Sequence, residues 1–191
     1  MIEDVSIGIC KDSDFVKTQR VHYKQQGTQK AWDMVEVHDS VAILIYHTQK
    51  DAFILVKQFR PPVYLKNDDG FTYELCAGIV DKEHTLEQIA QEEIDEECGY
   101  DVAIEKIERI TSFYTAVGFA GAHQTLYYCE VDESMQAHEG GGIHAEDIEV
   151  VYLDVNEAKE FVLDESKSKT PGLMFAMMWW FDRDSSAKVA P

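Results

Sequence analysis

The stretch from Gly78 to Tyr100 reads GIVDKEHTLEQIAQEEIDEECGY and carries the strongest structural signal in the chain. Thr85, with Gln88 three residues later, forms a capping-box pattern that predicts the first turn of a helix. Gly99 suits the position just beyond a helix, where the backbone takes a left-handed conformation. These two signals predict a helix over Leu86 to Cys98 whose register is fixed by its own ends.

Three acidic residues of this helix have an unusual placement. A helix turns about 100° per residue, so the apolar stripe from Leu86 to Ile94 also contains Glu93 and Glu97, about 40° apart. Glu96 lies beside them, and three neighbouring carboxylates repel one another unless divalent cations neutralise them. From the helix alone, an ordinary charged flank explains the pattern equally well.

The same stretch resembles the Nudix box, whose pattern is G-x5-E-x7-R-E-U-x-E-E-x-G-U, where U is a bulky apolar residue. The matching positions have the expected spacing, and they are Gly78, Glu93, Ile94, Glu96, Glu97, Gly99 and Tyr100.

Two positions of the box depart from the pattern. His84 stands where the pattern has its first Glu, although Glu83 is adjacent, and Glu92 stands where it has Arg. That Arg normally helps to orient the motif carboxylates. An acid at position 92 adds like charge at i,i+4 to Glu96, so we expect tighter metal binding and poorer positioning of the base.

The resemblance extends from Trp32 to Leu153 and is to the branch of ADP-ribose and UDP-sugar pyrophosphatases, most closely to UDP-glucose pyrophosphatases. The segments that carry it are Ala31-Trp32-Asp33, Val56 to Pro61, Glu74 to Gly78, Glu96 to Tyr100, Gly140-Gly141-Gly142 and Glu146 to Val150. It implies an α+β fold, the Nudix α/β/α sandwich with a mixed β-sheet. Residues 1–38 would form a small N-terminal β-rich layer involved in dimerisation, and residues 39–191 the hydrolase domain.

Local sequence patterns predict the remaining elements. Alternating β-branched and aromatic residues predict six strands, at Val41 to Tyr46, Phe53 to Phe59, Thr72 to Cys76, Ile107 to Phe113, Thr125 to Val131 and Glu149 to Leu153. Helices are expected after Asn156 and from Thr170-Pro171 through Trp180. Gln26-Gly27 indicates a hairpin in the N-terminal layer, and Asn67 to Gly70 indicates a turn.

The resemblance also implies the metal-binding and catalytic residues. Glu93 and Glu97 would be the main ligands of Mg²⁺, with Mn²⁺ as a possible substitute, and the backbone carbonyl of Ala77 another ligand. Glu96 would be a further ligand or a partner of the attacking water. Glu146 would bind metal or act as a base, and His144 would be a candidate general base unless it is only a solvated loop residue.

Three residues are candidates for binding the substrate. Trp32 resembles the aromatic residue on which this branch stacks the nucleobase, often across a dimer interface; packing within that interface explains it equally well. Arg60 and Lys57, near the end of a predicted strand, are suited to binding phosphate oxygens, and an ordinary surface ion pair is the alternative.

Composition limits the partners of the protein. With 36 acidic and 17 basic residues, the formal charge of −19 repels nucleic acid and anionic membranes, and it favours divalent cations between carboxylates and a phosphate substrate. The apolar runs fall short of the ~20 residues that a membrane helix needs. The four cysteines have no zinc-site spacing, which favours reduced thiols and a cytoplasmic location.

The sequence thus predicts a homodimeric, Mg²⁺-dependent enzyme acting on nucleoside diphosphate sugars of the UDP-glucose or ADP-ribose type. It would hydrolyse the diphosphate bond and give a nucleoside monophosphate with a sugar 1-phosphate or ribose 5-phosphate. A catalytically impaired nucleotide-sugar sensor is the alternative, because of His84 and Glu92. An acidic cation-buffering scaffold protein explains the charge but not the placement of Glu93 and Glu97.

Overall fold

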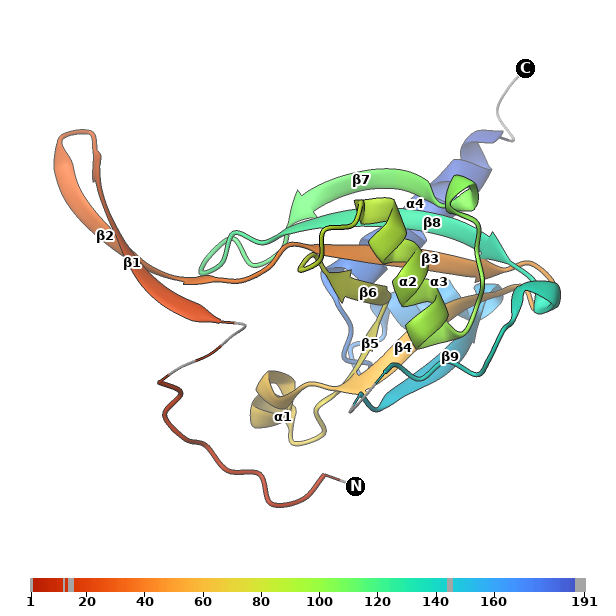
Figure 1. Cartoon of the computed structure of the whole chain (residues 1–191), viewed down its shortest axis with the longest axis horizontal. Helices are drawn as coiled ribbons and strands as arrows, with labels where there is room; N and C mark the ends of the chain where they lie inside the picture. The colour runs from red at the N-terminus through yellow and green to blue at the C-terminus, as the bar shows by residue number, and fades with distance from the viewer. Residues whose placement is uncertain (1, 12, 14–15, 144–145, 188–191) are drawn as a thin grey trace.

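The central sheet is organised around strand β3 (Ser40–His47), as the computed structural model in Figure 1 shows. The structure describes residues 2–11, 13, 16–143 and 146–187, with the backbone alone for residues 184–187. β3 runs antiparallel to β4 (Ala52–Phe59) and parallel to β8 (His123–Val131) along its whole length. The sheet is therefore mixed, as the sequence predicted.

Seven strands make up this sheet, in the order β5-β4-β3-β8-β7, with β6 paired to β3 and β9 paired to β4. The outer strands are β5 (Phe71–Glu74), β6 (Cys76–Ile79), β7 (Glu108–Tyr114) and β9 (Ile148–Asp154). Short 3-10 turns at Ile104–Lys106 and Glu133–Met135 precede β7 and follow β8.

Alternating side chains of β3 and β4 divide the core between two layers of helices. Val41, Ile43 and Ile45 are buried with the apolar residues of helix α2 (Leu86–Cys98). Leu44 of β3 and Leu55 of β4 point to the other face and are buried with the apolar residues of α3 (Val155–Leu163) and α4 (Pro171–Ala187). Because successive strand residues point to opposite faces, a sheet buried on both sides gives the α/β/α sandwich that the resemblance implied.

Helix α2 begins and ends where its sequence predicted. The Thr85 side chain accepts a hydrogen bond from the backbone N–H of Gln88, and the Gln88 side chain accepts one from the N–H of Thr85. At the other end Gly99 has a φ of 79° and donates its N–H to the carbonyl of Asp95. Local hydrogen bonds thus set the rotation of α2, and with it the face on which Glu93 and Glu97 lie.

Two features differ from the expected elements. The strand expected over Thr72 to Cys76 is two strands: β5 pairs with β4, and after Leu75 the chain pairs with β3 as β6. Helix α1 (Pro61–Asn67) is not among the expected elements, because two prolines after a predicted strand suit the end of that strand as well as the first turn of a helix. The turn after α1 is confirmed: Asn67 Oδ1 accepts hydrogen bonds from the backbones of Asp69 and Gly70.

The N-terminal hairpin forms a separate two-stranded sheet that projects from the body (Figure 1). β1 (Lys17–Gln25) and β2 (Thr28–Glu36) pair in full register, with left-handed backbone at Gln26 and Gly27. Loop 116–121 contacts the hairpin, through the Val35 N–H bonded to the carbonyl of Phe119. No helix of the described residues is long and apolar enough to cross a membrane.

The helix cap gives a test of how locally α2 is specified. We expect Thr85→Ala to lower the free energy of unfolding by about 1 kcal/mol, because it leaves an N–H of the first turn without its partner. Thr85→Ser keeps the hydroxyl and should stay within a few tenths of a kcal/mol of the parent. Urea denaturation of both variants measures this, and equal stability of the alanine and serine variants would contradict a capping role.

Candidate active site

Glu97 joins helix α2 to strand β6. Its side chain is buried, with the residue 5% exposed, and Oε2 accepts a hydrogen bond of 2.9 Å from the backbone N–H of Ala77. A buried carboxylate is costly unless it is paired or bound to a cation. The Cys76 thiol also contributes a hydrogen bond to this carboxylate. These neutral donors leave acceptor capacity of Glu97 available to a cation.

Glu93 lies one turn earlier and rests on the backbone of Gly78. A Cβ atom at Gly78 would lie 2.0 Å from Glu93 Oε1 and 2.5 Å from its Cγ, so a side chain there would displace the carboxylate. The glycine therefore allows a close approach of helix and strand at this point. It brings Glu93 next to the segment that contains Ala77.

Both carboxyl groups hold their protons unusually strongly. Burial, reinforced by the negative charge of Glu96, raises the pKa of Glu93 to about 7. Burial also raises the pKa of Glu97 to about 8; the Ala77 N–H opposes this shift and the charge of Glu93 adds to it. A cation that binds here would relieve the repulsion and replace the protons.

The glycine loop packs against the C-terminal end of α2. The N–H groups of Gly141 and Gly142 donate to the backbone carbonyls of Glu97 and Glu96, at 2.8 and 3.0 Å. All three glycines have positive φ, and a Cβ at Gly140 would lie 2.4 Å from the carbonyl oxygen of Glu97. Only residues without a side chain allow this loop to contact the helix so closely.

The loop brings Glu146 near the helix carboxylates. Glu146 is exposed, its Oε2 accepts a hydrogen bond of 2.9 Å from the N–H of Ile143, and its charge contributes to the raised pKa of Glu93 and Glu97. Glu146 is thus grouped with them, and its role in binding metal or acting as a base stays a prediction. His144, the other expected base, lies outside the described residues.

Arg60 lies beside the carboxylates, but it is already paired. Its guanidinium donates two hydrogen bonds of 2.8 Å to the carboxylate of Glu74, which is 9% exposed. The pKa of Arg60 is raised, first by Glu74 and further by the charges of Glu97 and Glu146. The ion pair foreseen as an alternative exists, and it holds a half-exposed cation close to the acids.

Lys57 is engaged with the neighbouring strand. Its ammonium is 2.9 Å from a carboxylate oxygen of Glu149, the residue opposite it in the pairing of β4 with β9. It also lies over the ring of Phe71. A role in binding phosphate stays a prediction for Lys57.

The two residues that depart from the Nudix pattern contact each other. His84 Nδ1 lies 2.8 Å from Glu92 Oε1, and Lys82 Nζ lies 3.0 Å from Glu92 Oε2. Sequence reasoning did not single out Lys82. The sequence signal for Lys82 as a site residue was its position two residues before His84, in the loop that leads to the acidic helix α2.

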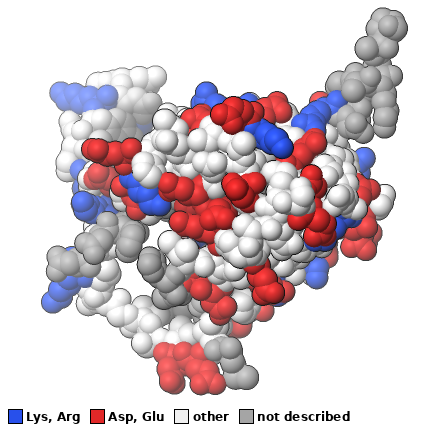
Figure 2. Space-filling view, turned by 45° about the vertical axis from the view of Figure 1, so that its right-hand side comes forward, with Lys and Arg blue, Asp and Glu red and all other residues white. Residues whose placement is uncertain are grey.

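The residues present fit a divalent cation through their chemistry. Carboxylate and carbonyl oxygens are the ligands that Mg²⁺ prefers. Among the described residues no three His, Cys, Asp or Glu side chains already converge as a chelating cluster. The helix thus offers Glu93 and Glu97 as a pair, to be completed by backbone or substrate oxygens. On the face shown in Figure 2, acidic side chains cover more of the surface than basic ones do.

A pocket of about 360 Å³ lies on the sheet side of this site. Ala77 and Glu74 form part of its wall, Phe113 and Gln124 line it from β7 and β8, and Pro171 from the start of α4. The pocket therefore adjoins the backbone segment that contacts Glu97. An organic group bound here would lie beside Glu74 and the Ala77 segment.

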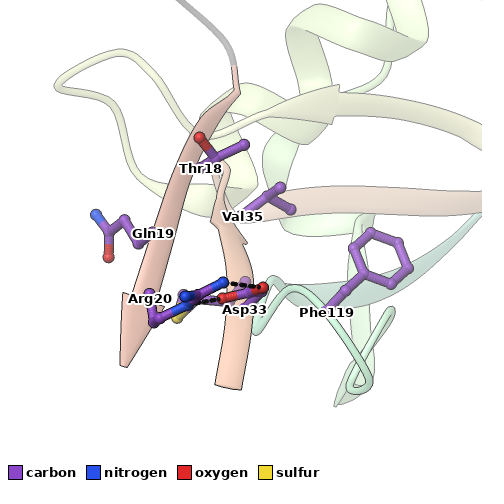
Figure 3. Close-up of a pocket in the computed structure, with 7 residues that line it drawn as sticks. Thr18, Gln19, Arg20, Asp33, Val35 and Phe119 are labelled. Carbon is purple, nitrogen blue, oxygen red and sulfur yellow. Dashed lines mark hydrogen bonds and ion pairs between the residues drawn. The ribbon is translucent and has the colours of Figure 1, made fainter. Parts of the chain in front are cut away.

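Trp32 lies on the projecting hairpin and is 56% exposed. Its indole N–H donates to the carbonyl of Gly118, at 2.9 Å. The next residue, Asp33, pairs with Arg20 in a shallow pocket that Phe119 borders (Figure 3). Within one chain, Trp32 is thus on the hairpin side of loop 116–121, and its role in stacking a nucleobase stays a prediction.

Known proteins give independent information on the chain. The family model described as NUDIX domain matches residues 36–171. Uridine diphosphate glucose pyrophosphatase NUDT14 of Bos taurus is 37% identical, and the match covers 94% of both chains. The protein of the same name from Mus musculus is 34% identical over 95% of both. GDP-mannose pyrophosphatase of Pectobacterium atrosepticum is 36% identical over 63% of this chain and 61% of its own.

The raised pKa values predict how pH acts on the metal-free protein. Both carboxyls have folded-state pKa values above the ordinary 4.5, so between pH 4.5 and 8 these two groups bind more protons in the folded chain than in the unfolded one. Their contribution to the free energy of unfolding should therefore fall as pH rises through this window, by roughly several kcal/mol. Urea denaturation in the presence of chelator measures it. Glu97→Gln should flatten the slope, and an unchanged slope would contradict the assignment.

The contact between Glu93 and Gly78 gives a second test. Gly78→Ala places a methyl group where the Glu93 carboxylate lies, and the end of that side chain can move away at little cost to folding. We expect Mg²⁺ affinity to fall about tenfold or more, since a displaced ligand is lost from the site. Isothermal titration calorimetry with Mg²⁺ checks this, and Gly118→Ala, which has open space around it, is the matched control.

Proposed function

The chain belongs to the Nudix family, and we propose that it hydrolyses the diphosphate bond of nucleoside diphosphate sugars with the help of Mg²⁺. The observation that carries this proposal is the pair of proton-retaining carboxylates, half-buried Glu93 and buried Glu97, on a helix held against the Ala77–Gly78 segment. The relatives described above are named as pyrophosphatases of nucleotide sugars, namely UDP-glucose and GDP-mannose.

The reaction adds water to one phosphorus atom and breaks the bridging P–O bond. The products are a nucleoside monophosphate and a sugar 1-phosphate, or ribose 5-phosphate from ADP-ribose. When bound, Mg²⁺ would neutralise the phosphate oxygens and lower the pKa of the attacking water. Glu93, Glu97 and the carbonyl of Ala77 are the groups that would hold it, with Mn²⁺ as a possible substitute.

Four groups would complete the reaction. Glu96 and Glu146 both lie near Glu93, because their charges raise its pKa. Glu96, Glu146 or His144 would accept the proton of the attacking water. Arg60 is half-exposed and fixed by Glu74, so it offers its remaining donors to a phosphate oxygen with little loss of side-chain freedom.

The organic parts of the substrate have two candidate places. The pocket beside Ala77, lined by Phe113 and Gln124, would take the group attached to one phosphate. Trp32 on the hairpin would stack a nucleobase in the second subunit of a homodimer, because the exposed Trp32 and Val21 suit contact with another copy. A cytoplasmic location, where the buried thiols of Cys76, Cys98 and Cys129 stay reduced, belongs to the same proposal.

Substitution of one carboxylate tests the proposed activity. We expect Glu97→Gln to lower kcat on a nucleoside diphosphate sugar by about a hundredfold or more, since the amide keeps the size of the side chain but loses its charge. The assay measures both phosphomonoester products from UDP-glucose, GDP-mannose and ADP-ribose with Mg²⁺, with Mn²⁺ and with chelator.

Three further results interpret this experiment. Chelator should abolish product formation in the parent protein. Asp95→Asn, on the opposite flank of the same helix, should hydrolyse the substrate like the parent, because Asp95 is paired with His138 rather than directed at β6. Parental turnover by Glu97→Gln, or binding of all three compounds without turnover under every metal condition, would refute the proposal.

A further inference from the structure

Loop 80–85 joins the two halves of the candidate site. It connects β6, which contributes Ala77 and Gly78, to the first turn of α2, and Val80 at its start donates its N–H to the carbonyl of Asp39 at 2.8 Å. Any change in this loop alters how β6 sits relative to the carboxylates two turns into the helix. The residues that tie the loop to the helix therefore affect the geometry of the site.

Glu92 receives two contacts from this loop. The His84 imidazole and the Lys82 ammonium each take one oxygen of its carboxylate, at 2.8 and 3.0 Å. The three side chains are partly exposed, at 44% for His84 and Lys82 and 32% for Glu92. A carboxylate bound through both oxygens is fixed in orientation as well as position.

The positions of these residues give the contact its meaning. His84 and Glu92 are the only two positions at which residues 78–100 depart from the Nudix pattern as matched above, and they lie against each other. In the pattern the loop position is acidic and the helix position is basic. In this chain the loop supplies the donors and the helix supplies the acceptor, so the polarity of the contact is reversed.

We propose that Lys82 and His84 position the metal-binding face of α2 by binding Glu92, a reversed pair in which the loop carries the basic side chains and the helix the acid, opposite to the residue types of the Nudix pattern at positions 84 and 92. The proposal rests on the hydrolase function proposed above. In this proposal His84 and Glu92 are compensating changes in one interaction. Considered separately, Glu92 predicted poorer positioning of the base.

The surroundings of Lys82 support this role. Its pKa is raised, first by Glu92 and also by the charges of Glu96 and Glu93, and its own charge lowers that of Glu93. Lys82 thus lies within electrostatic reach of the carboxylates and offsets part of their repulsion. Although this chain lacks the Arg of the pattern, Lys82 of the loop therefore supplies a cation near the site.

The reversed pair makes a prediction opposite to that of the motif. Glu92→Arg restores the residue of the Nudix pattern, and if position 92 acted alone, the variant would be more active. With Lys82 and His84 facing it, an arginine meets two basic side chains, and we expect kcat/KM to fall about tenfold or more. His84→Glu alone places two carboxylates together, and we expect it to lower kcat/KM by about threefold or more.

The decisive experiment is the double exchange His84→Glu with Glu92→Arg, which rebuilds the contact with the other polarity. We expect its kcat/KM and its Mg²⁺ affinity by calorimetry to return to within about threefold of the parent, so that the two effects are strongly non-additive. Glu133→Arg, which breaks the 2.9 Å pair with Lys50 at the β3–β4 turn, changes the formal charge by the same amount as Glu92→Arg alone and should leave both quantities at the parental value.

The outcomes separate this proposal from the enzyme function. Higher activity of Glu92→Arg alone, or a double exchange as impaired as the sum of its single changes, would refute the reversed pair. Parental protein without turnover of any nucleotide sugar would refute the function, and the calorimetric cycle would still decide on the pair. Thermal unfolding of the metal-free variants within about 3 °C of the parent separates positioning from a loss of folding.

Discussion

The contact between helix α2 and strand β6 is the constraint on which the candidate site depends. Glu97 is buried with one hydrogen bond from the Ala77 N–H, and Glu93 occupies the space that a side chain at position 78 would fill. Burial and mutual repulsion disfavour the charged forms of these two carboxyl groups, so in the folded chain they favour binding a proton or a cation. The site is a cost to the stability of the metal-free protein and a gain in its capacity to bind a divalent ion.

The surrounding elements keep that contact in place. Below the helix, the change of partner at Leu75 moves the chain from β4 to β3 and brings β6 under α2. At the end of the helix, the glycine loop bonds to the carbonyls of Glu96 and Glu97 and brings Glu146 to the same place. Neither arrangement is specified by the helix itself.

The charges around the site show how a strongly acidic protein handles a phosphate substrate. The chain carries a formal charge of −19, yet Arg60, Lys82 and His84 lie beside the acids that matter most. Arg60 pairs with Glu74, and Lys82 pairs with Glu92. Neither acid is among the proposed metal ligands. Local pairs of this kind tune the site while the overall charge repels polymeric anions.

Sequence alone determined the features that depend on neighbouring residues. The limits of α2, its capping box, the positions of most strands and the family could be read from local patterns, because caps, turns and alternation are set within a few residues. Helix α1 was missed because two prolines suit a strand end and a helix start equally well. Glu93 and Glu97 were found through the spacing of the Nudix box, Glu146 through the wider resemblance, and Arg60 through its place near the end of a predicted strand.

Tertiary structure decided what depends on residues far apart in the chain. Whether Arg60 is free or paired depends on Glu74, on another strand, and the environment of Glu97 depends on the amide of Ala77, twenty residues earlier. The meaning of His84 and Glu92 also changed, because a pattern reports each position separately and only the fold shows that the two side chains touch. Burial and pairing set the energies of charged groups, and both are properties of the assembled chain rather than of its order.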